Sequence, residues 1–188
     1  MNAEGKATPS PPNHSLNTDE QSSSARLRDS QMPVRLATDS ARVIAPAPVL
    51  YAVAFLVGLV AEFVLPTAPL PRVVELWLGA VIILISIPIV VSAVRALARG
   101  RTAFDASKPT TRIVTDGAFR YSRNPTYLSL TLLYVGLAFV VGSFWVLLMV
   151  VPAVAVTHWG VVLREERYLE SKFGEEYRRY AQRVRRWV

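Results

Sequence analysis

The stretch YLSLTLLYVGLAFVVGSFWVLLMVVPAVAVTHWGVVL, residues 127–163, contains no Asp, Glu, Lys or Arg. As one α-helix it would be roughly 55 Å long, because an α-helix rises 1.5 Å per residue. The hydrocarbon core of a bilayer is only about 30 Å thick. The stretch must therefore fold back on itself, and Gly142-Ser143 is the natural turn. It predicts a hairpin of two membrane-spanning helices, over about 125–141 and 143–163.

Two further apolar runs precede the hairpin. The first, Val49–Leu65, is just long enough to cross a bilayer when it is extended into Ala45–Pro48. The second, Val73–Ala98, is long and contains Pro88, which membrane helices tolerate. Prolines at positions 66, 69 and 71 mark the turn between them. The chain is thus expected to be an all-α, multi-pass transmembrane protein, with its first two spans at about 48–65 and 73–98.

Composition limits what lies outside the spans. The first 44 residues are mostly polar and lack an apolar period, so they are predicted to form a disordered tail before a membrane domain over 45–188. The chain has no cysteine, and His14 and His158 are far apart in sequence. No metal site is therefore predicted.

The distribution of positive charge predicts the orientation. Arg and Lys cluster in the tail, in Arg95–Arg123 and after Leu163, whereas the connections at Pro66–Arg72 and Gly142-Ser143 carry only Arg72. By the positive-inside rule both termini and the middle loop are cytoplasmic, and a bacterial inner membrane is expected. Topology and anionic membrane lipids then explain the net charge of +7. No nucleic-acid partner is expected, because no nucleic-acid-binding motif accompanies the charge.

The C-terminal segment has one apolar face, with residues recurring at steps of three or four. These residues are Leu169, Phe173, Tyr177, Tyr180, Val184 and Trp187. Five arginines lie off this face, at positions 178, 179, 183, 185 and 186. The pattern therefore predicts a basic amphipathic cytosolic helix over about 165–187, on the inner membrane surface and interrupted at Gly174.

Two polar clusters at the cytoplasmic interface could carry chemistry: residues 111–127 and Arg164-Glu165-Glu166. Asn124-Pro125 is a good helix start, and the simpler interpretation is that it only begins the third span. The same helix N-terminus is a natural site for a carboxylate or phosphate. Glu165 and Glu166 could pair with neighbouring arginines, or could bind a cationic ligand such as an amine or a sulfonium.

His158 and Glu62 are ionisable residues that fall within the predicted spans. His158 lies seven residues before Glu165, on the same face of a helix, and a polar residue two turns inside the membrane is a functional candidate. The alternative is a neutral histidine that is hydrogen-bonded to a neighbouring helix. Glu62, near the outer end of the first span, is expected to snorkel.

The two clusters together resemble a known family. Their order is G-x-[FY]-x-x-x-R-[HN]-P-x-Y, a helical hairpin, and E-E-x-x-L-x-x-x-F-G-x-x-Y-x-x-Y-x-x-x-V. This order resembles the isoprenylcysteine carboxyl methyltransferase family, which is related to the phospholipid methyltransferases. The matching residues are Gly117, Phe119, Arg123, Asn124, Pro125, Tyr127, Glu165, Glu166, Leu169, Phe173, Gly174, Tyr177, Tyr180 and Val184.

The resemblance implies an integral-membrane methyltransferase that uses S-adenosylmethionine, held at the cytosolic face, and a lipophilic small molecule or lipid that enters from the bilayer. By position, the cofactor contacts would be Thr111, Arg112, Ile113, Val114, Gly117, Phe119, Arg123, Asn124, Pro125, Thr126, Tyr127 and Glu165. Glu165 could bind the cofactor's ammonium group, and the N-terminus of the third span its carboxylate.

The candidate catalytic residues are Glu165, Glu166, Arg164 and His158. A carboxylate or thiolate acceptor needs no base, whereas an amine must lose a proton, and then His158 or Glu166 is the candidate base. The chain departs from the prenylcysteine enzymes at two positions. It has Asn124-Pro125 where eukaryotic members have His-Pro, and Val161 where those enzymes carry a substrate-facing arginine, for which Arg164 is the candidate substitute.

Two alternatives remain open at this point. One is N-methylation of a phospholipid or another amine. The other is a non-catalytic membrane scaffold of the same fold. The sequence predicts neither the acceptor nor the oligomeric state.

Overall fold

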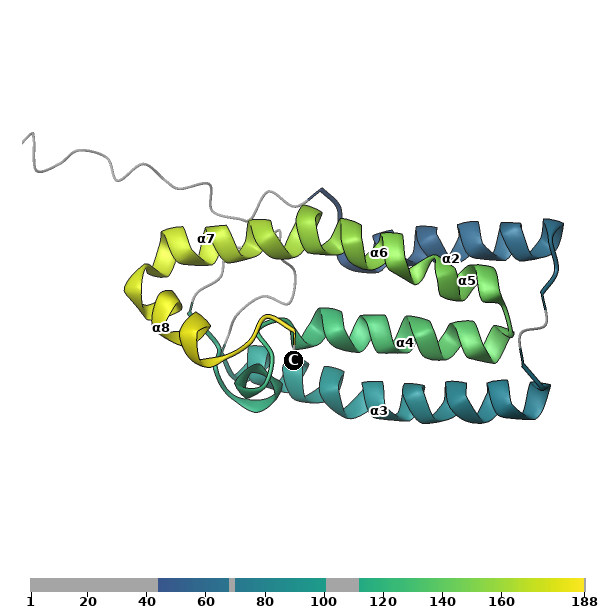
Figure 1. Cartoon of the computed structure of the whole chain (residues 1–188). Coiled ribbons are helices and arrows are strands. Elements are labelled where there is room, and N and C mark those ends of the chain that lie inside the picture. The colour runs from purple at the N-terminus through teal and green to yellow at the C-terminus, as the bar shows by residue number, and fades with distance from the viewer. Residues whose placement is uncertain (1–43, 68–69, 101–111, 188) are drawn as a thin grey trace, which may run out of the picture. The chain divides into compact units, whose positions relative to one another are not determined.

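A computed structural model of the chain describes residues 44–67, 70–100 and 112–187 (Figure 1). Every regular element in these residues is a helix, so the predicted all-α class is confirmed for the part of the chain that the structure describes. The predicted tail lies outside the described residues except for Ile44, as does Thr111.

Three helices are long and apolar enough to cross a membrane, judged by length and composition: α2 (Ala47–Val64), α3 (Arg72–Arg99) and the continuous helical stretch Phe144–Phe173. Between them lies α4 (Pro125–Val141), an apolar helix of 17 residues. The bounds of α2, α3 and α4 agree within one residue with three of the four predicted spans.

The turn between α4 and the following helix lies where the sequence predicts it. Gly142 ends α4 with φ 76°, in the left-handed region that glycine adopts without steric cost. Its N–H donates to the carbonyl oxygens of Ala138 and Phe139, both at 3.0 Å. Ser143 then caps α5 (Phe144–Leu148), because its hydroxyl accepts a hydrogen bond from the N–H of Val146 at 3.1 Å.

Glu62 is part of this turn and does not simply snorkel, which corrects the sequence prediction. Its carboxylate accepts hydrogen bonds from the hydroxyls of Ser143 at 2.6 Å and Thr67 at 2.7 Å. The indole of Trp145 donates to the carbonyl oxygen of Leu65 at 2.8 Å. These contacts join the end of α2 to the hairpin turn.

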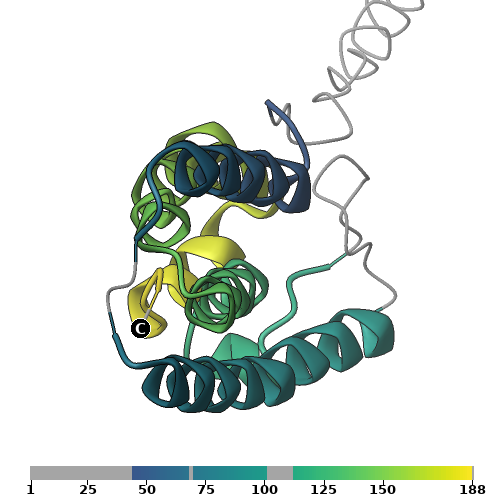
Figure 2. The ribbon, with the colours of Figure 1, turned by 90° about the vertical axis from the view of Figure 1, so that its right-hand side faces the viewer.

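The helices pack in two pairs. Figures 1 and 2 show α3 alongside α4, and α2 alongside α5 and α6 (Val150–Thr157). A buried cluster joins the two pairs: Tyr51, Tyr134, Ala138, Val146 and Ala153. Within it the rings of Tyr51 and Tyr134 meet edge to face at 5.7 Å.

The last predicted span and the C-terminal helix form one continuous helical stretch. After α6 come a π-helix, η2 (His158–Val162), and α7 (Leu163–Phe173). The predicted break at Gly174 is confirmed, with φ 50°, and α8 (Glu175–Arg183) follows. The predicted end of the helix near residue 187 is wrong. Val184 is extended, and residues 185 and 186 instead bond to the segment before α4.

Two glycines allow α3 and α4 to approach closely. A Cβ on Gly79 would lie 2.7 Å from the carbonyl oxygen of Gly136, and a Cβ on Gly136 would lie 3.0 Å from that of Gly79. Small residues at such crossings are typical of membrane helices, which gain stability from close backbone packing.

This crossing predicts that Gly79→Leu destabilises the protein by about 1–3 kcal/mol, the usual cost of overpacking. The measurement is thermal unfolding in detergent. The matched control is Ala80→Leu, which adds bulk at the neighbouring exposed position and should leave the melting temperature unchanged. Equal melting temperatures for the two variants would contradict the proposed role of the crossing.

Candidate functional site

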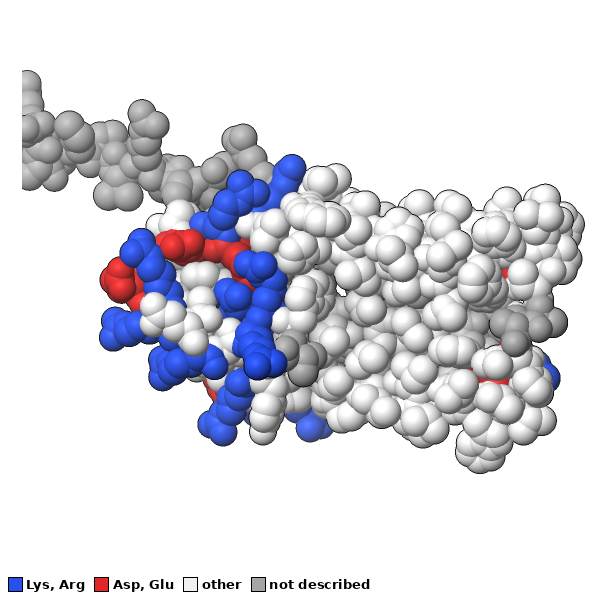
Figure 3. All heavy atoms as spheres, viewed as in Figure 1, with Lys and Arg blue, Asp and Glu red and all other residues white. Residues whose placement is uncertain are grey.

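Charged side chains gather at one end of the helices. In the view of Figure 3 the sides of the helices are almost free of Lys, Arg, Asp and Glu, whereas the end formed by α7 and α8 carries many of them. The same end holds both polar clusters that the sequence singles out, residues 112–127 and 164–166.

A cavity opens at this end between α3, α4, α7, α8 and the segment before α4. Its space, counted out through the open mouth and including open solvent, is about 720 Å³. Its lining residues are Leu97, Arg112, Ile113, Val114, Phe119, Arg123, Asn124, Thr126, Tyr127, Glu165, Glu166, Leu169, Tyr177 and Tyr180. Ten of the predicted site residues thus lie around one cavity, although they come from two segments nearly forty positions apart.

A hydrogen bond joins the two clusters directly. The hydroxyl of Tyr127, in the first turn of α4, donates to a carboxylate oxygen of Glu165 at 2.9 Å. Because Glu165 stands in the first turn of α7, this bond connects the start of the third predicted span to the end of the fourth. The carboxylate is thereby held at the cavity wall.

Four predicted site residues do not line the cavity. Gly117 begins the short helix η1 (Gly117–Arg120), and Pro125 is buried in the first turn of α4. Arg164 is exposed, and His158 lies against Trp187, with ring centroids 6.0 Å apart. The π-helix η2 begins at His158. Because a π turn holds more residues than an α turn, the seven-residue spacing to Glu165 no longer by itself predicts a shared helix face.

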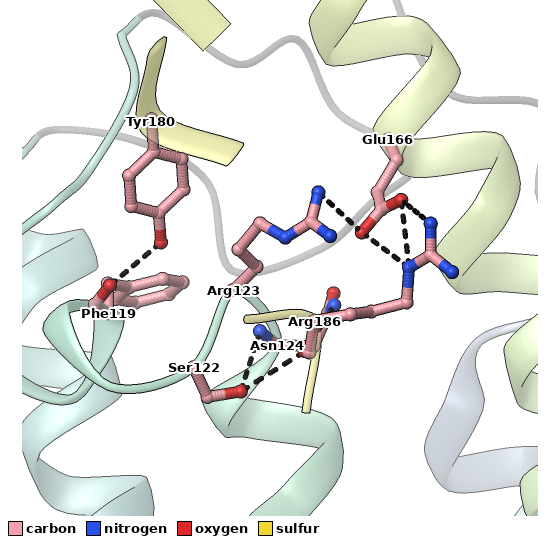
Figure 4. A network of polar contacts seen from close by, with 7 residues as sticks. All are labelled: Phe119, Ser122, Arg123, Asn124, Glu166, Tyr180 and Arg186. Carbon is pink, nitrogen blue, oxygen red and sulfur yellow. Dashed lines mark hydrogen bonds and ion pairs between the residues drawn. The ribbon is translucent and has the colours of Figure 1, made fainter. Parts of the chain in front are cut away.

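Asn124 precedes α4 as predicted, but its side chain does not cap the helix. Its amide nitrogen Nδ2 instead donates to the carbonyl oxygen of Arg186 at 3.0 Å. The hydroxyl of Ser122 donates to the same oxygen at 3.3 Å (Figure 4). The prediction that Asn124 serves as a side-chain cap is therefore wrong, and its amide binds the C-terminal segment.

Glu166 binds two arginines (Figure 4). The guanidinium of Arg186 donates to both carboxylate oxygens, with distances of 2.7 to 3.0 Å, and Nη1 of Arg123 lies 3.3 Å from Oε1. The Glu166 side chain is only 12% exposed and that of Arg123 15%. Both oxygens are thus engaged by guanidinium groups, which favours a structural role for Glu166 over proton transfer.

Arg123 has a polar atom that the structure leaves unsatisfied. Its Nε is buried and has no hydrogen-bond partner among the described residues, although the side chain lines the cavity. Unsatisfied buried donors are uncommon in proteins, and a bound ligand is one explanation for such a group.

Two tyrosines form the aromatic part of the wall. Burial raises the pKa of Tyr177 to about 12, with the Glu166 carboxylate adding to the shift and Arg123 opposing it. Burial likewise raises the pKa of Tyr180, whose hydroxyl donates to the carbonyl oxygen of Phe119 at 2.8 Å. Both side chains are neutral at physiological pH and face the protein, so the apolar face of this segment packs on the site at these positions, not on the membrane as predicted.

Sequence reasoning missed Leu97 and Arg186. Leu97 lies in the last turn of α3, and nothing distinguishes it from the other apolar residues of that helix. Arg186 follows the last residue of the family pattern and is one of several nearby arginines, so the sequence gives no signal for its contact with Glu166.

Comparison with known proteins agrees with this geometry. Residues 74–176, more than half of the chain, match the family described as Phospholipid methyltransferase. The chain belongs to this family. The phospholipid methyltransferase family includes membrane methyltransferases like the isoprenylcysteine carboxyl methyltransferases, so the resemblance found in the sequence is confirmed. Membership implies methyl transfer from S-adenosylmethionine.

One curated relative is similar over a shorter stretch. It is a protein of Haemophilus influenzae described as uncharacterized, and it is 47% identical over 62 residues. Those residues are 33% of this chain and 98% of that protein.

Proposed function

We propose that this protein is an integral-membrane methyltransferase that transfers a methyl group from S-adenosylmethionine to a lipophilic acceptor. The observation that carries the proposal is the cavity that residues of both polar clusters line. The hydrogen bond from Tyr127 to Glu165 joins the two clusters. Family membership supplies the reaction class.

The cavity residues fit the chemical groups of the cofactor. The Glu165 carboxylate suits an ammonium group, and the Arg123 guanidinium suits a carboxylate, as does the N-terminus of α4. The rings of Phe119, Tyr177 and Tyr180 offer faces for a purine and for a positively charged sulfur. When bound, the cofactor supplies an electrophilic methyl group.

The chain's own part in the reaction is to position the two reactants and to exclude water. Neither of the two candidate bases is well placed for proton transfer, since Glu166 is engaged by two arginines, and His158 lies against Trp187 and does not line the cavity. This arrangement favours an acceptor that attacks without losing a proton to the protein, such as a carboxylate or thiolate. The family description favours a second candidate, N-methylation of a phospholipid amine.

The proposal includes a topology of four spans with both termini in the cytoplasm. In addition to the three long apolar helices, α4 has 17 residues, about the minimum for a span. The cavity is lined by the end of α3, the start of α4 and the start of α7. Four spans bring these three helix ends to the side that carries the arginines.

The topology predicts opposite labelling of two single-cysteine variants, since the natural chain has no cysteine. A membrane-impermeant maleimide should label Leu70→Cys in intact cells, but Gln182→Cys only after the membrane is permeabilised. Both positions are exposed in the structure. Labelling of both variants in intact cells would contradict the four-span arrangement.

Methyl transfer itself predicts that membranes containing the protein incorporate labelled methyl groups into lipid-extractable products. Base-labile label indicates an ester, and base-stable label indicates N-methylation. Membranes containing the Glu165→Gln variant are the control. Equal incorporation with and without the intact protein would leave the non-catalytic scaffold as the better interpretation.

The role of Glu165 predicts that Glu165→Gln weakens binding of S-adenosylmethionine by about 10- to 100-fold, the worth of a charge-assisted hydrogen bond. Calorimetric titration measures the affinity. Binding of 5′-methylthioadenosine, which lacks the amino-acid portion, should be unchanged. Glu175→Gln, at an exposed position, is the matched control. A variant that binds both ligands like the wild type would contradict this assignment.

A further inference from the structure

The C-terminal segment, residues 184–187, bonds to residues that line the cavity. None of its residues lines the cavity, yet three cavity residues are bonded to it. The N–H of Arg123 donates to the carbonyl oxygen of Arg185 at 2.9 Å, and the amide of Asn124 donates to that of Arg186 at 3.0 Å. The Arg186 side chain holds Glu166. The segment therefore fixes the cavity wall at three points, as Figure 4 shows for the contacts of Arg186.

Arg186 differs from the other arginines near the C-terminus. Arg179 and Arg183 are exposed, and their Nε atoms donate to backbone carbonyls of their own helix. Arg186 instead reaches a carboxylate twenty positions away and contacts both of its oxygens. A planar guanidinium suits such two-pronged recognition, which a lysine ammonium cannot reproduce.

Because Glu166 pairs with two arginines, each of them affects how strongly the other is bound. Arg186 makes the short contacts to Glu166, whereas Arg123 makes one longer ion pair with it at 3.3 Å. The Arg123 side chain lines the cavity, and its buried Nε has no hydrogen-bond partner among the described residues. Without Arg186, the poorly exposed Glu166 carboxylate would have Arg123 as its one cationic partner among the described residues. Arg123 would then satisfy the carboxylate more fully, and the cluster would lose its net positive charge, which disfavours an anionic ligand group.

We propose that Arg186 is a positioning residue, which neutralises Glu166 and so keeps Arg123 directed at the carboxylate of the bound cofactor. The proposal rests on the proposed function and assigns part of its binding site to the extreme C-terminal segment. Arg186 itself does not touch the ligand in this scheme. It acts through Glu166 and Arg123.

If Arg186 acts through Arg123, its removal should weaken binding only of ligands that carry the amino-acid carboxylate. S-adenosylhomocysteine carries the amino-acid carboxylate, and 5′-methylthioadenosine does not. Removing Arg186 should weaken binding of S-adenosylhomocysteine and leave binding of 5′-methylthioadenosine unchanged. Only S-adenosylhomocysteine has a carboxylate that can interact with Arg123. A merely structural role for Arg186 would weaken both ligands alike.

The experiment titrates the full chain in detergent with both ligands, using Arg186→Gln and the control Arg183→Gln. Arg186→Gln should lower the affinity for S-adenosylhomocysteine by about 10-fold or more, the scale of a lost charged hydrogen bond. Its affinity for 5′-methylthioadenosine should not change, and Arg183→Gln should bind both ligands like the wild type. Arg186→Lys should recover only part of the loss.

A double variant tests whether Arg186 acts through Glu166. If it does, Glu166→Gln/Arg186→Gln should bind S-adenosylhomocysteine no more weakly than Glu166→Gln alone, because coupled residues are not additive. Additive losses would overturn the proposal. So would wild-type affinity of Arg186→Gln for S-adenosylhomocysteine, or equal losses for both ligands. Failure of the wild-type protein to bind either ligand would instead overturn the proposed function.

Discussion

A bilayer accepts only about 30 Å of apolar helix, and the charge-free stretch from Tyr127 to Leu163 is longer than that. Gly142 resolves the mismatch by ending α4 in the left-handed conformation, after which the chain runs back. A hairpin has its two ends on one side. The residues just before it and just after it are therefore neighbours, and the bond from Tyr127 to Glu165 forms between them. The candidate site depends on this fold-back more than on any single side chain.

A second constraint on the charged end of the molecule is electrostatic, because two acidic side chains there must be stabilised. Acidic residues are uncommon where a helix meets an anionic membrane surface, and this chain places two of them side by side at the end of a span. Each is bonded within the protein: Glu165 to Tyr127, and Glu166 to Arg123 and Arg186. Some of the basic residues that topology alone appeared to explain thus also stabilise buried acids. The predicted orientation in the membrane and the contacts that build the site thus involve the same arginines.

Much of this could be predicted from the sequence because it depends on local rules. Apolar length and the Gly142-Ser143 turn determine the bounds of α4, and the break at Gly174 follows from glycine's conformational freedom. The cavity lining could be predicted because the family pattern fixes residue order.

The errors occurred where tertiary contacts override local preference. The π-helix η2 interrupts the α-helical spacing between His158 and Glu165, and no composition rule reveals a single wider turn. Asn124 has a side chain that often caps helices. Its amide instead donates a hydrogen bond to the carbonyl oxygen of Arg186, which is far away in sequence. The C-terminal segment also could not be recognised, because Val184 and Trp187 continue the spacing of an amphipathic helix, whereas the helix ends at Arg183 and Val184 is extended.

The structure also bears on which acceptor could be recognised. Val161, which stands where prenylcysteine enzymes carry a substrate-facing arginine, is 1% exposed and packed in η2. Arg164, the candidate substitute, is exposed and does not line the cavity. The described cationic residues that do line it are Arg112 and Arg123, and Arg123 is bound on one side by Glu166. An acceptor carboxylate or thiolate, as proposed above, would therefore share these two cations with the cofactor's carboxylate, so that both reactants would meet at Arg112 and Arg123. The apolar sides of the helices would suit the lipophilic remainder of such an acceptor.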